Sequence, residues 1–288
     1  MADYPEGNSP FQEEPLPKNQ TEVRFRHEAN RAGWNEGARY YRSHIDQTIQ
    51  DLKDGKSNLH PIERRNLGDL HQYHTAIHLQ CASGNDTLSL WLEGVEHVIG
   101  IDISDIHIEN ARRVSAALNA PAEWFRCDVL DTPHELDNTA DLVYTGRGAI
   151  CWIHDLCEWA KVIARLLKPN GVFHILDDHP ITWLFNSEAS TLEYSGINYF
   201  NYAESSQGWP DTYIGNSIGI PLDQQSRKYE RLWTISSILN ALHSAGLSIE
   251  YLGEHPEPYW DNFPNLSAEF RNRIPMTFSL LARKPPLG

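Results

Sequence analysis

The sequence predicts a doubly wound α/β fold with a mostly parallel seven-stranded sheet and an antiparallel final strand. From His74 onward, short apolar runs alternate with amphipathic helical segments, which is the pattern of strands joined by helical crossovers. The last two runs have no helical segment between them, so they can pair antiparallel. The runs expected to form strands are 76–80, 98–102, 123–127, 141–145, 172–176, 247–252 and 276–282.

Signals at the ends of the helical segments predict where the helices begin and end. A helix is expected from about Asp86, after the first strand. Ser104 and Asp155 each precede an apolar stripe at helical spacing, as N-cap residues do. Pro169 is expected to stop the helix that Asp155 begins, and a further helix is expected over 234–245. These helices supply the crossovers that a parallel sheet requires.

Three segments depart from this alternation. Residues 1–20 are polar and rich in proline and predict a mobile tail, whereas residues 21–70 carry a helical pattern. Within the main domain, 71–288, an insertion at about 181–232 is too long for an ordinary connection. Its aromatic density argues against disorder and predicts a lid or substrate wall, although these side chains could also simply pack the lid onto the domain. The candidate wall residues are Tyr199, Tyr202, Trp209 and Tyr213.

Composition narrows the class of protein. The chain has 288 residues, 40% of them hydrophobic, and a formal net charge of −15, which argues against nucleic acid as a partner. No apolar run approaches the roughly 18 residues of a membrane helix, and the first residues do not read as a signal peptide. The four cysteines form no CxxC pair, and no paired metal-ligand spacing occurs. We therefore expect a cytoplasmic enzyme without a bound metal, and the composition leaves a homodimer open.

Residues at three consecutive strand ends indicate a nucleoside-type ligand. Gly84 allows a tight turn between the first strand and its helix, although an ordinary strand–helix turn would look the same. Asp102 ends the second strand, where a carboxylate can accept both hydroxyls of a ribose or cap the next helix. Asp128, followed by Val129, can accept from an adenine amine or be a solvated loop residue. Three suitable residues in succession favour a binding site.

These motifs resemble the class I S-adenosylmethionine-dependent methyltransferases. The similarity lies in HLQCASGNDTLSL, VIGIDIS, FRCDVLD and the stretch from DLVYTGRGAICW to VFHILDDHP, and extends over roughly residues 28–285. It is strongest with the subgroup whose first motif reads LQCxxGxDTL. The resemblance implies a Rossmann-like methyltransferase fold, S-adenosylmethionine as cofactor and S-adenosylhomocysteine as product. Gln80 and Ala82 depart from the common pattern, which has an acidic residue and a glycine at these positions.

The resemblance also implies a role for individual residues. The first motif would cradle the methionine portion of the cofactor, the second-strand acid and its neighbour would contact the ribose and adenine, and the fourth-strand loop, which includes Arg147, would pass the sulfonium. The helical segment 21–70 would form a cap over the cofactor. The cofactor-binding residues expected in this way are Trp34, Tyr40, Gln80, Cys81, Ala82, Ser83, Gly84, Asp102, Ile103, Asp128, Val129, Thr145 and Gly146.

A histidine after the fifth strand is the candidate general base. His179 follows Asp177 and Asp178 in ILDDHP, and an imidazole titrates near working pH. The same position would suit a substrate contact without proton transfer, or a turn in which the imidazole only satisfies the backbone. His255, in a second His-Pro turn, is a weaker candidate for the same role.

The expected function is methyl transfer from S-adenosylmethionine to a small-molecule acceptor, on oxygen or nitrogen, with an aromatic or amine metabolite as one option. A tRNA or protein methyltransferase of the same fold is an alternative that the net charge of −15 argues against. A nicotinamide-dependent oxidoreductase would need a G-x-G-x-x-G turn and a parallel sixth strand, and the sequence provides neither. A non-catalytic binding protein of this fold is the remaining alternative.

Overall fold

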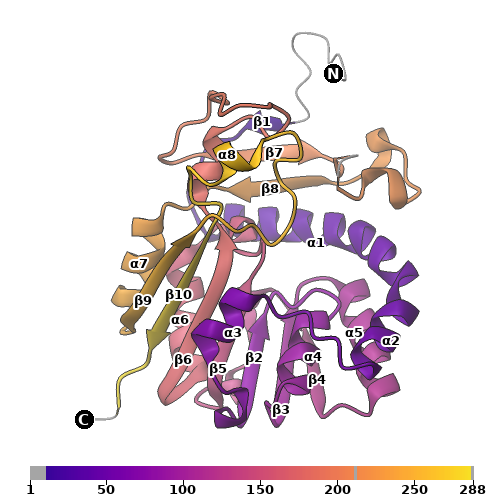
Figure 1. Ribbon diagram of the computed structural model, residues 1–288, viewed down its shortest axis with the longest axis vertical. Coiled ribbons are helices and arrows are strands. Elements are labelled where there is room, and N and C mark those ends of the chain that lie inside the picture. The colour runs from indigo at the N-terminus through magenta and orange to yellow at the C-terminus, as the bar shows by residue number, and fades with distance from the viewer. Residues whose placement is uncertain (1–10, 211–212, 287–288) are drawn as a thin grey trace.

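A computed structural model describes residues 11–210 and 213–286. Its main sheet has seven strands in the order β4-β3-β2-β5-β6-β10-β9 (Figure 1). The first five of these are parallel to one another, and β10 pairs antiparallel with both β6 and β9. This confirms the predicted α/β fold with its antiparallel final strand.

The elements follow the expected alternation with small shifts at their ends. The strands of the main sheet are β2 (Thr75–Leu79), β3 (His97–Asp102), β4 (Ala122–Arg126), β5 (Ala140–Gly146), β6 (Leu167–Asp178), β9 (Ser248–His255) and β10 (Thr277–Arg283). The helices are α1 (Gln20–Ser43), α2 (Ile45–Lys53), α3 (Pro61–Leu67), α4 (Asn85–Leu92), α5 (Asp105–Leu118), α6 (Leu156–Leu166), α7 (Ile235–Ser244) and α8 (Ala268–Arg271).

The predicted N-caps are confirmed. The side chains of Ser104 and Asp155 each accept a hydrogen bond from a backbone N–H in the first turn of the helix that follows. Thr234, expected as the first residue of a helix, is the N-cap of α7 in the same way. Helix α6 ends at Leu166, before the proline at position 169, and the chain passes directly into β6. The caps fix where the helices start, and therefore where the loops at the carboxyl edge of the sheet end.

Two apolar layers hold the sheet between its helices. Alternate residues of the central strands, such as Ile77 and Val143, pack on α6 and α7, where Trp159 is fully buried. Their neighbours Ala76 and Leu142 point to the opposite face and pack near α3. Side chains alternate between the two faces of a strand, so a sheet covered on both faces has almost continuously apolar strands.

A second, three-stranded sheet was not predicted. It consists of β1 (Phe11–Glu13), β7 (Ala203–Gln207) and β8 (Arg227–Arg231), all antiparallel. Strand β1 lies within the tail predicted at 1–20, and α1 begins at Gln20, so the second half of that segment is ordered. The first half of the predicted tail lies outside the described residues. The two longer strands belong to the insertion at 181–232, which therefore carries regular structure.

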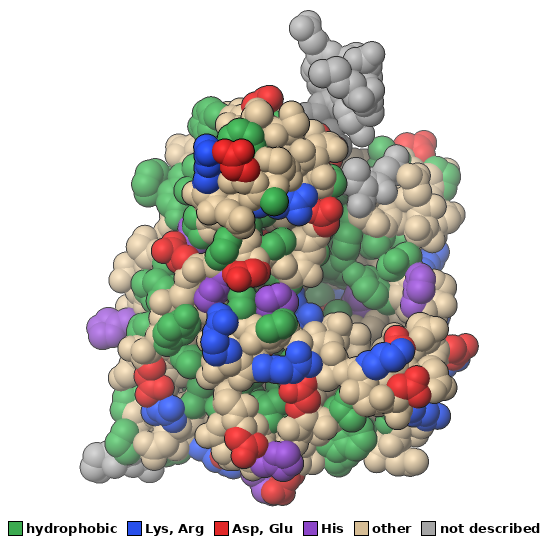
Figure 2. Space-filling model, in the orientation of Figure 1, with side chains coloured by type: hydrophobic (Ala, Val, Ile, Leu, Met, Phe, Trp, Pro, Cys, Tyr) green, Lys and Arg blue, Asp and Glu red, His purple; other side chains and the backbone are tan. Residues whose placement is uncertain are grey.

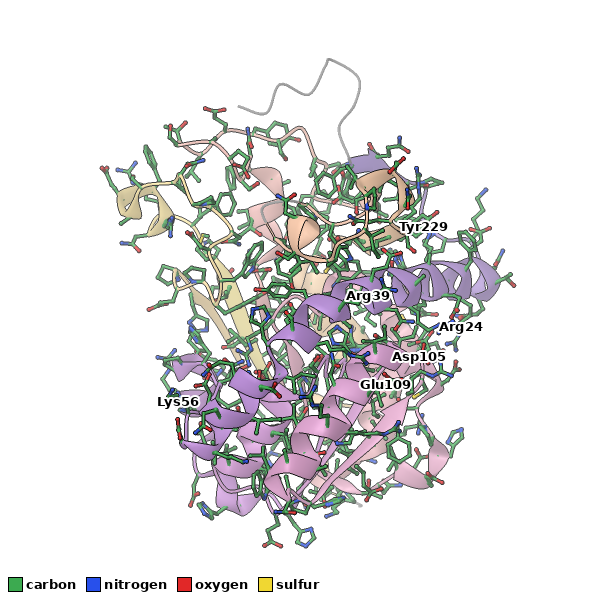
Figure 3. The ribbon with its side chains drawn as sticks, turned by 90° about the vertical axis from the view of Figure 1, so that its right-hand side faces the viewer. Arg24, Arg39, Lys56, Asp105, Glu109 and Tyr229 are labelled. Carbon is green, nitrogen blue, oxygen red and sulfur yellow. The ribbon has the colours of Figure 1, made fainter. Side chains whose placement is uncertain are left out.

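Helix α1 lies between the two sheets. Figures 1 and 3 show it crossing the molecule below β8, with α5 on its other side. The Asn30 side chain exchanges two hydrogen bonds with the backbone of Tyr229 in β8, at 2.7 and 2.8 Å. Arg31 forms an ion pair with Asp105 at the start of α5. Helix α1 thus joins the insertion to the main domain over the carboxyl edge of the parallel strands.

Candidate active site

Two adjoining cavities lie at the carboxyl edge of the parallel strands. The first has a volume of about 300 Å³ and is lined by the loops after β2, β3, β4 and β5 together with α1 and α2. The second, of about 600 Å³, lies between the loops after β5 and β6 and the insertion. Trp34, Arg147 and Trp152 are among the residues that line both. Figure 2 shows this face of the molecule hollowed beneath the part that carries the small sheet. The two cavities therefore share part of their walls at the carboxyl edge of the sheet.

The loop after β2 has an unusual backbone. Gln80 and Ala82 adopt left-handed conformations with φ of 60° and 46°, which are uncommon for residues other than glycine. The Gln80 amide nitrogen donates to the carbonyl of Ala149 at 2.6 Å, so its oxygen faces away from that carbonyl. This oxygen is buried and has no hydrogen-bond partner among the residues that the structure describes. A ligand donor such as an ammonium group would satisfy it.

Gly84 gives this loop the space it needs. It has φ of 81°, and a Cβ atom placed on it would lie 2.5 Å from the ring of Trp124. We therefore expect Gly84→Ala to destabilise the fold by roughly 1–3 kcal/mol through overpacking, with a further cost for the left-handed backbone. The shift of the urea midpoint measures it. Gly55→Ala, also at positive φ but with open space around it, is the matched control, and equal shifts would contradict the packing argument.

Asp102 is fixed by the loop it faces. Its two carboxylate oxygens accept from the backbone N–H groups of Ala82 and Ser104, both at 2.8 Å. Burial raises the pKa of Asp102 to about 6, although these N–H groups act in the opposite direction. Each oxygen retains a further acceptor site, so the carboxylate can still receive the two hydroxyls of a ribose.

Asp128 connects the site to helix α1. One oxygen accepts from the backbone N–H of Leu130 at 2.9 Å, and the other contacts Arg24 at 2.7 Å and His27 at 2.8 Å. Burial alone would raise the pKa of Asp128, but the hydrogen bond and charge of His27, with Arg24, bring it below its usual value. Of the roughly four acceptor sites of a carboxylate, three are used, which leaves one for an adenine amine. Asp128 therefore also anchors α1 over the first cavity.

Asp177 shapes the loop that separates the two cavities. Its carboxylate accepts from the backbone N–H groups of Gly148, Ala149 and Ile150 at 2.8 to 3.1 Å, and from that of Asp178 at 2.8 Å. Burial raises the pKa of Asp177, while the four N–H groups oppose that rise. Because its oxygens are used in this way, Asp177 holds a loop in place and has little capacity left for a ligand.

The second cavity combines aromatic walls with acidic groups. The indole of Trp34 lies against those of Trp152 and Trp209, with ring centroids 5.3 and 4.5 Å apart. The aromatic side chains that line this cavity are Phe11, Trp34, Tyr41, Trp152, Trp183, Phe185, Trp209, Tyr213, Trp233, Tyr259, Trp260, Phe263 and Phe278. Its carboxyl groups are Asp86, Asp177, Asp178, Glu204 and Glu230. Aromatic and acidic surfaces together suit an apolar ligand with a polar or cationic end.

Most of the predicted cofactor-binding residues line the first cavity. Those that do so are Trp34, Gln80, Cys81, Ala82, Ser83, Asp102, Ile103, Asp128, Val129 and Gly146. Tyr40 does not; the adjacent Tyr41 lines the cavity, while the Tyr40 ring packs on His44 and on the apolar cluster around Trp209. Thr145 is buried and donates to the carbonyl of Leu79, so it joins two strands. Gly84 does not line the cavity, but it allows the turn described above.

The two candidate histidine bases are held by contacts outside the cavity walls. His179 caps a short 3-10 helix by accepting from the N–H of Ile181, and its other ring nitrogen lies 2.8 Å from the carboxylate of Glu254. His255 lies 2.8 Å from the hydroxyl of Ser279 on the neighbouring strand. Neither is among the residues that line the two cavities, so the geometry gives no support to either as the base. The turn interpretation, in which the imidazole satisfies the backbone, describes His179.

The four predicted wall residues divide evenly. Trp209 and Tyr213 line the second cavity, and the Tyr213 hydroxyl is hydrogen-bonded to that of Tyr41 on α1. Tyr202 is buried and donates to Glu204, whereas Tyr199 packs on an exposed neighbouring ring, and neither forms part of the wall. The aromatic residues of the insertion therefore serve both as cavity wall and as packing.

Sequence reasoning missed several residues of the site. His27 and Arg24 of α1 reach Asp128 across about a hundred residues of chain, and no local pattern signals such a contact. Asp178 and Glu230 line the second cavity from different segments. The two adjacent acids at the end of the fifth predicted strand were a signal for Asp178, but the predicted base was the neighbouring His179.

Comparisons with known proteins agree with this geometry. Residues 76–171 match the family described as "Methyltransferase domain". Among solved structures, a S-adenosylmethionine-dependent methyltransferase from Mesorhizobium loti is 21% identical with a TM-score of 0.53, over 77% of this chain and 96% of that chain. A similar protein from Listeria monocytogenes has the same identity and TM-score, over 77% and 95% of the two chains. No curated protein matches the chain.

A third solved structure shows the range of reactions on this fold. It is the geranyl diphosphate C-methyltransferase of Streptomyces coelicolor in complex with Mg²⁺, geranyl diphosphate and S-adenosylhomocysteine. The identity is 13% and the TM-score 0.50, over 73% of this chain and 72% of that chain. The family match and the shared fold support an enzyme, a class I methyltransferase that takes its methyl group from S-adenosylmethionine. The unsatisfied oxygen of Gln80 and the free acceptor sites of Asp102 fit that cofactor.

Proposed function

We propose that this chain transfers the methyl group of S-adenosylmethionine to a small-molecule acceptor held in the second cavity. The observation that carries this proposal is that a cavity of about 300 Å³, lined by Gln80, Asp102 and Asp128, adjoins an aromatic cavity of about 600 Å³ and shares part of its wall. A cavity of the second size belongs to the range of small-molecule sites. Methyl transfer requires the acceptor atom to lie in line with the sulfonium methyl group, and adjoining cavities provide that alignment.

The residues of the first cavity have distinct roles in this proposal. Asp102 holds the ribose, and Asp128 with Val129 holds the adenine. The oxygen of Gln80 accepts from the ammonium group of the methionine portion, because it is buried and lacks a partner among the described residues. When bound, S-adenosylmethionine supplies an activated methyl group. The protein then has to orient the acceptor, exclude water and accept a proton.

A tRNA or protein acceptor is the alternative. A net charge of −15 opposes binding to a phosphate backbone, and a wall of aromatic side chains suits a small ligand better than a nucleic acid. In the part of the chain that the structure describes, no helix is long and apolar enough to cross a membrane. The net charge and the aromatic wall favour a small acceptor over a macromolecular one.

Methyl-labelled S-adenosylmethionine tests the proposal. We expect the enzyme to transfer label from this cofactor to the low-molecular-mass fraction of an extract from its own source. Pre-treatment of the extract with ribonuclease and protease should leave the transfer unchanged. Label that appears in RNA or protein instead, and disappears after these treatments, would reject the small-molecule acceptor while leaving the methyltransferase assignment intact.

Binding of the product gives an independent measurement. Calorimetry should detect S-adenosylhomocysteine bound to the purified chain at one site, and binding should not require an acceptor. NADH should not bind, because the loop after β2 lacks the glycine pattern of dinucleotide sites. An enzyme that binds NADH but not S-adenosylhomocysteine would contradict the proposed function altogether.

A further inference from the structure

We infer that the acceptor is an alkyl or arylalkyl amine, bound as its ammonium form by the Asp178 and Glu230 carboxyl groups between tryptophan side chains, and that its nitrogen receives the methyl group. This inference rests on the proposed function and specifies the acceptor of that same site. It follows from the charge of the second cavity, from the free oxygens of two carboxyl groups and from the aromatic walls.

Acidic groups outnumber basic ones in the second cavity. Five carboxyl groups line it, against Arg147, Lys228 and Arg231. Arg147 is already paired with Asp86, and the Asp177 carboxylate is satisfied by backbone N–H groups. Lys228 is likewise engaged, since it donates to the carbonyl of Gly208 and lies 4.3 Å from the ring centre of Trp209. Arg231 lies over the ring of Trp233 and donates to the carbonyl of His154. Among the described residues, none of these three cations forms an ion pair with Asp178, Glu204 or Glu230.

Asp178 has one oxygen that is free to bind a ligand. Its other oxygen accepts from the Tyr259 hydroxyl at 2.6 Å and from the Trp260 indole N–H at 3.2 Å. The free oxygen is buried and has no hydrogen-bond partner among the described residues. A buried carboxylate oxygen without a donor is costly unless a ligand supplies one. The ammonium group of an amine carries up to three donors and the charge that a carboxylate attracts.

Glu230 provides a second carboxyl group from the opposite side of the cavity. It lies on β8 of the insertion, and its side chain has no hydrogen bond to any residue in the described ranges 11–210 and 213–286. Glu204, on the neighbouring strand, differs because it accepts from the hydroxyl of Tyr202 at 2.6 Å. Burial and the negative charges of Glu204 and Asp178 raise the pKa of Glu230 to about 8. The positive charge of Lys228 acts in the opposite direction. A bound cation would lower that pKa and stabilise the ionised form.

The aromatic walls complete a site for a cation with an apolar body. Trp260 and Tyr259 are held beside Asp178 by hydrogen bonds to its other oxygen, so two aromatic side chains lie next to this carboxyl group. The face of an aromatic ring attracts an ammonium group, and an indole does so most strongly. Trp34, Trp152 and Trp183 extend the wall and can cover the carbon skeleton of the amine. A carboxylate acceptor would meet repulsion here, and a neutral alcohol would leave the acidic groups uncompensated.

Asp178 also provides the proton acceptor that methylation of an ammonium requires. The Asp178 carboxylate takes one proton from the ammonium group, and the nitrogen lone pair then forms a bond to the methyl carbon. The carbon–sulfur bond breaks, its electron pair stays on sulfur, and S-adenosylhomocysteine results. The product is a methylated ammonium ion, and Asp178 releases its proton to solvent. Charge and atoms balance without a metal or a redox partner.

The pH profile follows from the surroundings of Asp178. Burial raises its pKa to about 7, and the charge of Asp177 adds to that rise, whereas the hydrogen bonds from Tyr259 and Trp260 lower it. Glu230 and the Cys151 thiol are the other titratable groups that act across the cavity. The carboxylate form must be present to accept a proton, so kcat/KM should fall as the pH falls below about 7.

A panel of matched acceptors tests the inference with the full-length enzyme. We would compare tryptamine, tryptophol and indole-3-acetate, together with phenethylamine, 2-phenylethanol and phenylacetate, by formation of S-adenosylhomocysteine from saturating S-adenosylmethionine. We expect methylation of at least one amine and none of its alcohol or carboxylate counterpart. Methylation of an alcohol or carboxylate at the rate of its amine, or of no amine in an enzyme that binds the cofactor, would overturn the inference.

Two variants link the activity to the carboxyl groups. Asp178→Asn should lower kcat/KM for the amine by about 100-fold or more and remove the fall in activity below about pH 7. Glu230→Gln should raise KM for the amine with a smaller effect on kcat. Asp223→Asn, an exposed carboxyl group of the same insertion, is the matched control and should behave as the wild type. Amine methylation by Asp178→Asn with an unchanged pH profile would exclude Asp178 as the proton acceptor.

Cofactor binding separates this inference from the proposed function. Calorimetry with S-adenosylhomocysteine should give the same affinity for the wild type, Asp178→Asn and Glu230→Gln, since neither residue lines the first cavity. If the wild type fails to bind it, the proposed function fails. If binding is intact and label from methyl-labelled cofactor enters a small molecule that is not an amine, only the amine inference fails.

Discussion

Replacement of Asp102 by alanine is expected to abolish measurable binding of S-adenosylmethionine. The complex would lose the two hydrogen bonds that the Asp102 carboxylate accepts from the ribose, each worth about 1.5–3 kcal/mol for a charged acceptor. Roughly 1.4 kcal/mol corresponds to a tenfold change in affinity. The loss extends to the protein itself, because Asp102 also holds the N–H groups of Ala82 and Ser104. The loop after β2 would then no longer be fixed for the methionine portion of the cofactor.

Calorimetry of the Asp102→Ala variant with S-adenosylmethionine checks this result, with circular dichroism to show that the fold is retained. Asp102→Asn is the matched control: it keeps one acceptor oxygen and should bind with intermediate affinity. Because burial raises the pKa of Asp102 to about 6, wild-type affinity should also fall as the pH falls below about 6, where the carboxylate is protonated. Micromolar affinity in the alanine variant would remove Asp102 from the ribose site.

Replacement of Asp177 by alanine is expected to destabilise the protein by about 3 kcal/mol or more. Asp177 is buried and accepts from the N–H groups of Gly148, Ala149, Ile150 and Asp178, and its removal leaves these donors without a partner. Each unsatisfied buried group costs about 1–3 kcal/mol, and rearrangement of the loop recovers part of the total. The same loop separates the two cavities, so binding of S-adenosylhomocysteine should weaken as well.

Urea unfolding of the Asp177→Ala variant measures the change in stability. Asp177→Asn keeps an acceptor oxygen and should lose less, while the exposed Asp223→Asn should unfold at the wild-type midpoint. An alanine variant as stable as the wild type would show that the loop after β5 does not depend on this carboxylate. Retained stability with lost product binding would instead limit the role of Asp177 to the shape of the site.

Local patterns in the sequence predicted the framework of the first cavity. Ser104 and Asp155 were predicted as caps because a cap needs only a side-chain oxygen two or three residues before the N–H it accepts from. Asp102 was recognised because parallel strands bring their carboxyl ends to one edge. Such features depend on spacing along the chain, so they can be read from the residues alone.

Contacts between distant segments could not be predicted in this way. Strand β1 pairs with β7 across nearly two hundred residues, and β7 reads AESSQ, which has no apolar alternation that would identify a strand. His179 was expected near the reacting atoms, yet its imidazole caps the turn it belongs to and faces Glu254. The direction of a side chain depends on which neighbours satisfy it, and those neighbours come from other elements.

The resemblance of the motifs to methyltransferases implied which residues at the strand ends would suit S-adenosylmethionine. The sequence by itself determined the α/β fold and the helix caps. These follow from hydrophobic periodicity and from short-range hydrogen bonds, which act within a few residues. Only the tertiary structure decided that α1 is anchored to Asp128, that the candidate histidines do not line the cavities, and that Asp178 and Glu230 share the second cavity. The physical reason is that burial and charge at a site are set by side chains that meet only when distant segments pack together.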